Sequence, residues 1–98
     1  MKYSISSKAR IDLIGIWEYT MKNWSVEQAD RYYQFIVDKF SEIGSNPDLG
    51  KSYDDLRVGY RAINVKSHII FYKISRQYSI EIVRILHQRM DYKSRIIQ

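Results

Sequence analysis

The chain has 98 residues, which leaves room for one domain of roughly 100–200 residues and not for a second. Its composition, 45% hydrophobic and 28% charged, is that of a globular protein and excludes disorder. No apolar run approaches the ~20 residues of a membrane span, and no signal peptide is recognisable at the start. There is no cysteine, which excludes disulfides and thiolate chemistry and fits a cytoplasmic protein.

The positive charge of the chain is concentrated in its second half. Residues 1–50 carry 6 Lys and Arg against 7 Asp and Glu, a net of −1. Residues 51–98 carry 10 against 4, a net of +6. This asymmetry favours an anionic partner, such as nucleic acid, a phosphate-rich complex or an acidic protein segment. A basic, solvated surface without a partner is the alternative.

The first half predicts a short strand followed by a helix. Residues 2–6 alternate in polarity as a strand does. Ser7 is the predicted N-cap of a helix that runs to about Asn23. One side of this helix carries the apolar positions Ala9, Leu13 and Ile16, with Thr20 following at the same spacing.

A second helix is predicted to begin after Ser25, because Ser25 and Gln28 have the spacing of a capping box. Gly44 is the predicted C-cap, and Pro47 prevents the helix from continuing. The connection at residues 24–25 is short, so the two helices should form an antiparallel hairpin. The apolar stripe of the second helix is predicted to comprise Ala29, Tyr33, Ile36, Val37, Phe40 and Ile43.

After Pro47 the apolar period changes from about 3.6 to 2, which predicts strands over 60–65, 68–74 and 79–86. The connections at 66–67 and 75–78 are short enough for hairpins. Residues 88–98 are polar and basic, and either a short helix or a frayed end is expected there. The predicted fold is therefore α+β: a strand and a helical hairpin packed on a small antiparallel sheet.

The last two strands are apolar on both sides, whereas a sheet buried on one side should alternate. On strand 79–87, Ile82, Arg84 and Leu86 are predicted to point one way, and Val83, Ile85 and His87 the other. One helical hairpin covers one side only. An exposed apolar groove edged by arginines is therefore predicted, suited to a partner that lays down a helix or adds a strand. The alternative is that the C-terminal segment folds back over it.

Four blocks of sequence resemble the ParE-type toxins of the RelE/ParE superfamily, from bacterial type II toxin–antitoxin operons. The most specific block is Arg84-Ile85-Leu86-His87 followed by Met90-Asp91. The other matching residues are Ala9, Asp12, Leu13 and Ile16; then Asn46, Pro47, Gly50, Arg57, Gly59, Tyr60 and Arg61; then residues 67–72.

This resemblance implies an α+β toxin domain spanning 1–98, without catalysis, metal or cofactor, that inhibits DNA gyrase and halts replication. It also implies a cognate antitoxin that binds directly and forms a hetero-oligomer with the toxin; neither a membrane nor sequence-specific nucleic acid is expected as a partner. The residues expected to bind the antitoxin are Arg57, Arg61, Tyr72, Ile82, Arg84 and Leu86. Those expected to contact gyrase are His87, Arg89, Met90, Asp91, Lys93 and Arg95.

Two alternatives stay open at this point. The RelE branch of the superfamily cleaves mRNA on the ribosome, which needs a general base, a general acid and cations for the phosphate. If the chain is such a ribonuclease, its candidates are Arg61, Arg84, His87 and Tyr72. The other alternative is a degenerate, non-toxic module that still binds an antitoxin.

Several aromatic and histidine residues have simpler interpretations. The two histidines are 19 positions apart without paired carboxylates, which favours hydrogen-bonded structural residues over metal ligands. The pairs Trp17/Trp24 and Tyr32/Tyr33 are expected in the core or at the edge of the helical hairpin. One residue of each pair could face a partner.

Overall fold

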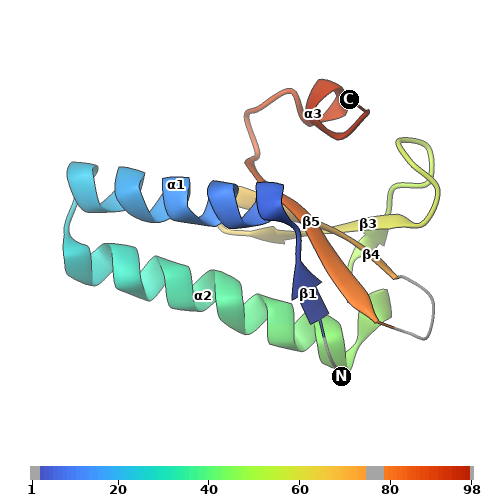
Figure 1. Ribbon diagram of the computed structural model, residues 1–98, viewed down its shortest axis with the longest axis horizontal. Helices are drawn as coiled ribbons and strands as arrows, with labels where there is room; N and C mark the ends of the chain where they lie inside the picture. The colour runs from blue at the N-terminus through green and yellow to red at the C-terminus, as the bar shows by residue number, and fades with distance from the viewer. Residues whose placement is uncertain (1–2, 75–78, 98) are drawn as a thin grey trace.

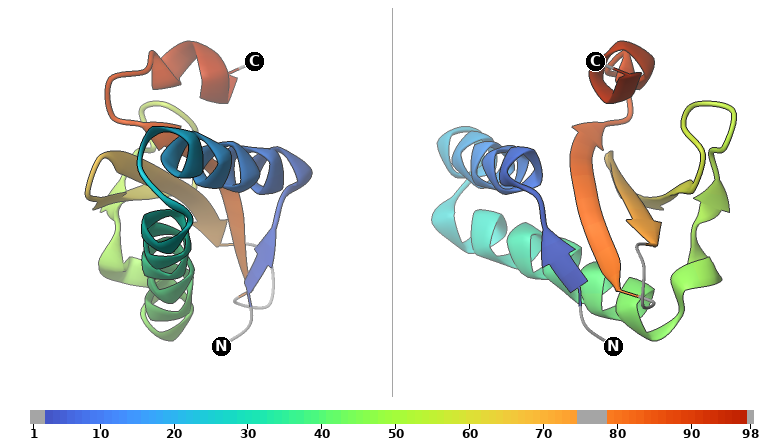
Figure 2. Two further views of the ribbon diagram at one scale, coloured as in Figure 1. Left: turned by 90° about the vertical axis from the view of Figure 1, so that its left-hand side faces the viewer. Right: turned by 45° about the vertical axis from the view of Figure 1, so that its right-hand side comes forward.

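The computed structural model describes residues 3–74 and 79–97. A five-stranded sheet runs in the order β1-β5-β4-β3-β2, and the long helices α1 and α2 lie together on one side of it (Figure 1). Figure 2 shows the loop that precedes β3 on the opposite side. The predicted α+β class is confirmed. The pairing of β1 (Tyr3–Ile5) with β5 (Ile80–His87) is parallel, a relationship that periodicity does not reveal.

Helix α1 spans Ser7–Asn23, but its N-cap is Ser6 and not Ser7. The Ser6 hydroxyl accepts from the Ala9 amide at 3.0 Å and donates to the Val83 carbonyl at 2.7 Å. The backbone amide of Ser6 also donates to Ile82. The helix therefore starts where the chain is already tied to β5, one residue earlier than predicted.

Helix α2 spans Val26–Ser45 and begins, as predicted, after the Ser25 cap, whose hydroxyl accepts from the Gln28 amide. Two details of the prediction are wrong. Gly44 lies inside the helix and is buried, and Asn46 ends it. Tyr33 is exposed, whereas Tyr32 packs against the core, because the buried stripe rotates by one position there. No helix in the described ranges is long and apolar enough to cross a membrane.

The other strands are β2 (Lys51–Ser52), β3 (Tyr60–Val65) and β4 (His68–Ile74), and a single 3₁₀ turn, η1, covers Pro47–Leu49. Strands β3 and β4 match their predicted ranges, and β5 begins one residue later than predicted. Strand β2 was not predicted, being only two residues long. The predicted hairpin connection at 75–78 lies outside the described residues.

A bulge in β5 changes the predicted side-chain directions. Phe71 pairs with Arg84 and Tyr72 with Ile82, which leaves Val83 as an extra residue. An extra residue reverses the alternation beyond it. Ile85 therefore joins Ile80 and Ile82 in the core beneath the helices, and Leu86 lies on the other side of the sheet. The predicted common direction of Ile82 and Leu86 is wrong for this reason.

The second side of the sheet is covered, so the predicted open groove there is wrong. Helix α3 (Tyr92–Ile97) folds back onto this side, with Ile96 only 4% exposed. The Tyr53 ring contacts Phe71 at 5.8 Å between centroids, and the Tyr92 ring contacts Phe71 at 5.5 Å. Phe71 and Leu86 are buried as a result. The short-helix alternative for the C-terminus is confirmed, and the C-terminal segment closes a second core.

Candidate functional site: a groove between the helical pair and the sheet

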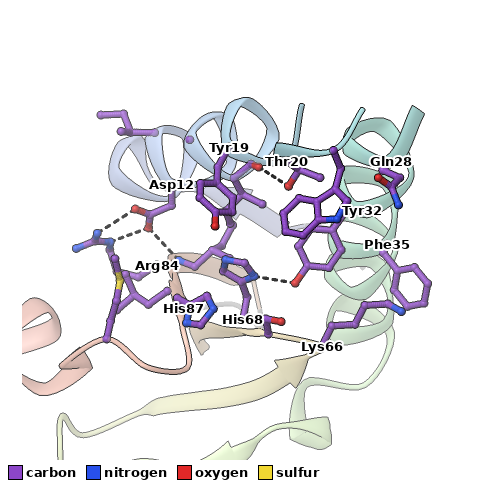
Figure 3. Close-up of a pocket in the computed structure, with 18 of the residues that line it drawn as sticks. Asp12, Tyr19, Thr20, Gln28, Tyr32, Phe35, Lys66, His68, Arg84 and His87 are labelled. Atoms are coloured by element: carbon purple, nitrogen blue, oxygen red, sulfur yellow. Dashed lines mark hydrogen bonds and ion pairs between the residues drawn. The ribbon is translucent and has the colours of Figure 1, made fainter. Parts of the chain in front are cut away.

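A groove of about 860 Å³ lies where the helical pair meets the end of the sheet (Figure 3). Helix α1 and the first half of α2 form one wall, and the β3–β4 turn with the end of β5 forms the other. Met90 and Arg95 line it from the C-terminal segment. The groove is thus assembled from both ends of the sequence.

The apolar lining of the groove comes mainly from a second stripe on α1. The side of α1 that carries Ala9 and Leu13 is buried as predicted. Ile11, 69% exposed, and Tyr19 lie on other positions of the same helix and line the groove. Trp24, 62% exposed, and Phe35 continue this surface. Exposed apolar side chains gathered around one hollow are typical of a protein–protein contact site.

Three basic side chains line the same groove without an acidic partner. Arg31 lies on α2, Lys66 in the β3–β4 turn and Arg95 on α3. Among the described residues, none of the three has a carboxylate oxygen within 4.0 Å. Basic side chains beside an apolar surface complement a segment that is apolar on one side and acidic at its edges.

The floor of the groove contains both histidines of the chain. His68 Nδ1 lies 2.7 Å from the Tyr32 hydroxyl, and the rings of His68 and His87 meet edge to face at 5.2 Å (Figure 3). Burial, reinforced by the neighbouring His87, lowers the pKa of His68 to about 4. Burial also raises the pKa of Tyr32. At neutral pH the Tyr32 hydroxyl and the His68 imidazole are therefore both uncharged. The interpretation of His68 as a hydrogen-bonded residue is confirmed.

Asp12 and Arg84 form an ion pair at the other end of the groove. The Arg84 guanidinium donates to both Asp12 oxygens, at 2.8 and 2.9 Å, and the Ile85 amide donates to the same carboxylate at 2.9 Å. Hydrogen bonding to Asp12 raises the pKa of Arg84. The charge of Arg84 is therefore neutralised within the protein, and its main contact is internal.

The residues expected to bind an antitoxin are dispersed through the structure. Tyr72, Ile82 and Leu86 are buried, which leaves them no exposed side-chain surface of use to a partner. Arg61 donates to the Gly50 carbonyl at 2.9 Å. Arg57 lies on the far side, beside Tyr60 and the Ile96 carbonyl. Of the expected set, Arg84 lines the groove, and Leu86 borders it although its side chain is buried in the second core.

The expected gyrase-contacting residues divide into two groups. His87, Met90 and Arg95 line the groove. Arg89, Asp91 and Lys93 are exposed and lie outside the groove lining.

The candidates for ribonuclease chemistry do not form one cluster. Tyr72 pairs with Ile82, and His87 lies five residues further along β5, roughly 16 Å away at the rise of a strand. The Tyr72 hydroxyl donates to the Pro47 carbonyl at 2.6 Å and accepts from the Gly50 amide at 2.8 Å. Tyr72 is fully buried, so it is not placed to exchange a proton with a substrate beside His87.

Most groove residues were absent from the predicted site. Tyr19, Arg31, Phe35 and Lys66 carried no motif. Gln28 was noted only for the cap of α2, and His68 only within the matching block 67–72. These residues come together when α2 packs beside the β3–β4 turn. A usable signal was present in α1, where Ile11 and Ile14 lie off the predicted apolar side. A helix that is apolar on more than one side needs a second contact. Of the predicted pairs Trp17/Trp24 and Tyr32/Tyr33, Trp24 and Tyr32 line the groove.

Comparison with solved structures supports the fold. A chain of the chromosomal ParDE TA system from P. aeruginosa superposes with a TM-score of 0.76 and 20% sequence identity. The match covers 89% of this chain and 95% of that one. At this identity the likeness concerns the arrangement of helices and strands.

Sequence comparison then defines the class, a toxin of a bacterial type II toxin–antitoxin system. The family model described as "ParE toxin of type II toxin-antitoxin system, parDE" matches residues 3–92. Toxin ParE1 of Mycobacterium tuberculosis is 37% identical over 90 residues, 92% of each chain. Toxin ParE1 of Caulobacter vibrioides is 35% identical over 94 residues, 96% of each chain. The chain belongs to the ParE toxin family.

Proposed function

We propose that this protein acts in the cytoplasm by inhibiting DNA gyrase, without catalysing a reaction of its own, and that a cognate antitoxin neutralises it by filling the groove. Membership of the ParE family supports the target. The observation that carries the antitoxin part is the groove itself, in which Tyr19 and Trp24 are exposed beside basic side chains that no described carboxylate pairs with. This surface replaces the sheet side that the sequence had favoured.

The occupant that fits the groove is an amphipathic segment. Its apolar side chains would pack on Ile11, Tyr19 and Trp24, and carboxylates at its edges would meet Arg31, Lys66 and Arg95. Large aromatic side chains at the centre of an interface commonly carry most of the binding energy. The basic side chains add orientation and speed of association.

A supercoiling assay tests the proposed target. Purified protein is added to gyrase with relaxed plasmid, and supercoiled product and cleaved DNA are both measured. Inhibition at micromolar protein is expected. Arg89→Ala and Lys93→Ala should weaken it if these exposed residues contact gyrase, with Lys8→Ala as a control on α1 outside the groove. Full gyrase activity in the presence of folded protein would overturn the proposal.

A binding assay tests the groove. The partner is the protein encoded by the reading frame next to this gene, and the measurement is the dissociation constant. Trp24→Ala should weaken binding about tenfold or more, as expected for an aromatic contact at an interface centre. Val58→Ala is the matched control, because Val58 is 87% exposed and lies outside the groove lining. Equal affinity of the two variants would exclude the groove as the binding surface.

The same preparations distinguish the remaining alternatives. His87 and Arg84 both line the groove, and these are the members of the ribonuclease set that a bound RNA could reach together. Primer extension after induction of the protein would reveal any new cuts in translated mRNA. Such cuts would show that the target is mRNA and not gyrase. Harmless expression without the antitoxin, with binding intact, would identify a degenerate module.

A further inference from the structure

Lys66 adopts an unusual backbone conformation at the mouth of the groove. It is the first residue of the two-residue turn between β3 and β4, closed by the pair Val65 and His68. Its φ is 54°, and among the described residues it is the sole non-glycine with positive φ. Positive φ is disfavoured for any residue that carries a Cβ, and glycine, or asparagine with its short polar side chain, adopts it most readily.

The contacts of Lys66 within the protein do not account for a lysine there. Its ammonium lies 4.6 Å from the centre of the Phe35 ring. Both side chains are exposed, and a cation over an exposed ring contributes little to stability. No described carboxylate pairs with it. Backbone strain that local contacts do not repay is typical of residues kept for binding or catalysis.

The position of the ammonium suits the capture of a carboxylate. The Phe35 ring lies beside it, and both residues line the groove. Arg31 lies one helical turn from Phe35 on α2 and lines the same groove. A charge-assisted hydrogen bond is stronger where an apolar group excludes water from one side.

We propose that Lys66 is a recognition residue of the groove, whose ammonium, held on Phe35, binds a carboxylate of the segment that occupies it. This inference rests on the proposed function, because it takes the antitoxin as the occupant. The strained backbone at residue 66 then lowers stability, while the lysine side chain strengthens binding. Stability favours asparagine at this position, and recognition requires lysine.

Three substitutions separate the roles of Lys66. Lys66→Asn removes both the strain and the charge, Lys66→Met removes only the charge, and Lys66→Arg keeps the charge. The dissociation constant for the antitoxin encoded by the adjacent reading frame, and the melting temperature of each free variant, are measured. Lys8→Met is the matched control for loss of a lysine outside the groove.

Asn and Met variants should both bind about tenfold more weakly, the size expected when one charged contact is lost from an interface. Lys66→Arg and Lys8→Met should bind like the parent. Lys66→Asn should melt about 4 °C higher than the parent, and Lys66→Met should not. Wild-type affinity of Lys66→Asn would overturn the inference, as would a lower melting temperature, which would assign the lysine to its contact with Phe35. If the parent itself binds no antitoxin, the proposed function fails instead.

Discussion

Asp12 holds Arg84 through both carboxylate oxygens and at the same time accepts the backbone amide of Ile85. One side chain of α1 thereby fixes β5, which lies between β1 and β4 in the sheet, just beyond its bulge. The side chains of both residues are mostly buried, 13% exposed for Asp12 and 14% for Arg84. An arginine predicted to meet a partner is instead a cross-link between the first helix and the last strand.

Asp12→Ala should lower the free energy of unfolding by about 3 kcal/mol, because a mostly buried guanidinium and the Ile85 amide lose their acceptor. Urea unfolding monitored by Trp fluorescence measures the effect. Adding Arg84→Met should recover part of the loss, since an apolar side chain tolerates the site without a counter-charge. Asp30→Ala, which removes an exposed contact with Trp17, serves as the control and should cost less than about 1 kcal/mol. A stability of Asp12→Ala equal to that control would contradict the cross-link.

Stability should fall as the pH is lowered from about 6.5 to about 4. His68 stays neutral in the folded state because burial and His87 lower its pKa to about 4, whereas the unfolded chain binds a proton near 6.5. The unfolded state therefore binds more protons in this range, and each step down in pH favours it. The loss should be about 1–2 kcal/mol after allowance for solvent screening.

Unfolding free energies at several pH values test this dependence. His68→Gln should flatten the slope between pH 6.5 and 4, while His87→Gln should keep a part of it, since burial is the larger cause of the shift. Because these are the two histidines of the chain, their imidazole NMR signals can be assigned from one variant. A His68 midpoint near 6.5 would show that the imidazole is not shielded.

Tyr72→Phe should destabilise the protein by about 2–3 kcal/mol, because the Gly50 amide and Pro47 carbonyl lose their shared hydrogen-bond partner in a buried site. At a temperature where the variant is folded, its toxicity should equal that of the parent. Tyr19→Phe, which alters an exposed tyrosine, is the control for stability. Loss of toxicity in a folded Tyr72→Phe variant would restore a chemical role to this hydroxyl.

Ile96→Ala should cost about 2–3 kcal/mol, since Ile96 closes the second core over Phe71 and Leu86. Arg95→Ala changes the adjacent, exposed residue and should leave the melting temperature within about 2 °C of the parent. Thermal unfolding of the two variants compares burial with charge at neighbouring positions. An unchanged melting temperature for Ile96→Ala would mean that α3 contributes nothing to the fold.

The local sequence pattern predicted the helices and strands well, but it predicted less well which side chains are buried and against what they pack. The Ser25 cap and the strands 60–65 and 68–74 follow from spacing within a few residues, so they could be recognised without a fold. Leu86 was predicted on the wrong side of the sheet because one bulged residue, Val83, reverses the side-chain directions that follow it in β5. The covering of Phe71 by Tyr53 and Tyr92 depends on contacts between distant segments, which no local period encodes.

The candidate site was the least predictable part for the same reason. Arg61 and Arg84 were expected to meet a partner, with internal hydrogen bonds as the alternative. Their acceptors, the Gly50 carbonyl and the Asp12 carboxylate, approach them only in the folded chain. The family resemblance gave the class of protein, and the family comparisons confirm it. The groove exists only because α2 and the β3–β4 turn lie side by side in the fold, which the sequence pattern does not reveal.

The parallel pairing of β1 with β5 has a consequence for how the protein is made. Residues 3–5 find their hydrogen-bonding partners in residues 80–82, nearly at the other end of the chain. A ribosome must synthesise residues 80–82 before this pairing can form, and contacts so distant in sequence also slow folding. Until β5 has been synthesised, β1 lacks its hydrogen-bonding partner and Asp12 of α1 lacks Arg84. The strand that is synthesised last of the five is thus the one on which the first strand and α1 pack.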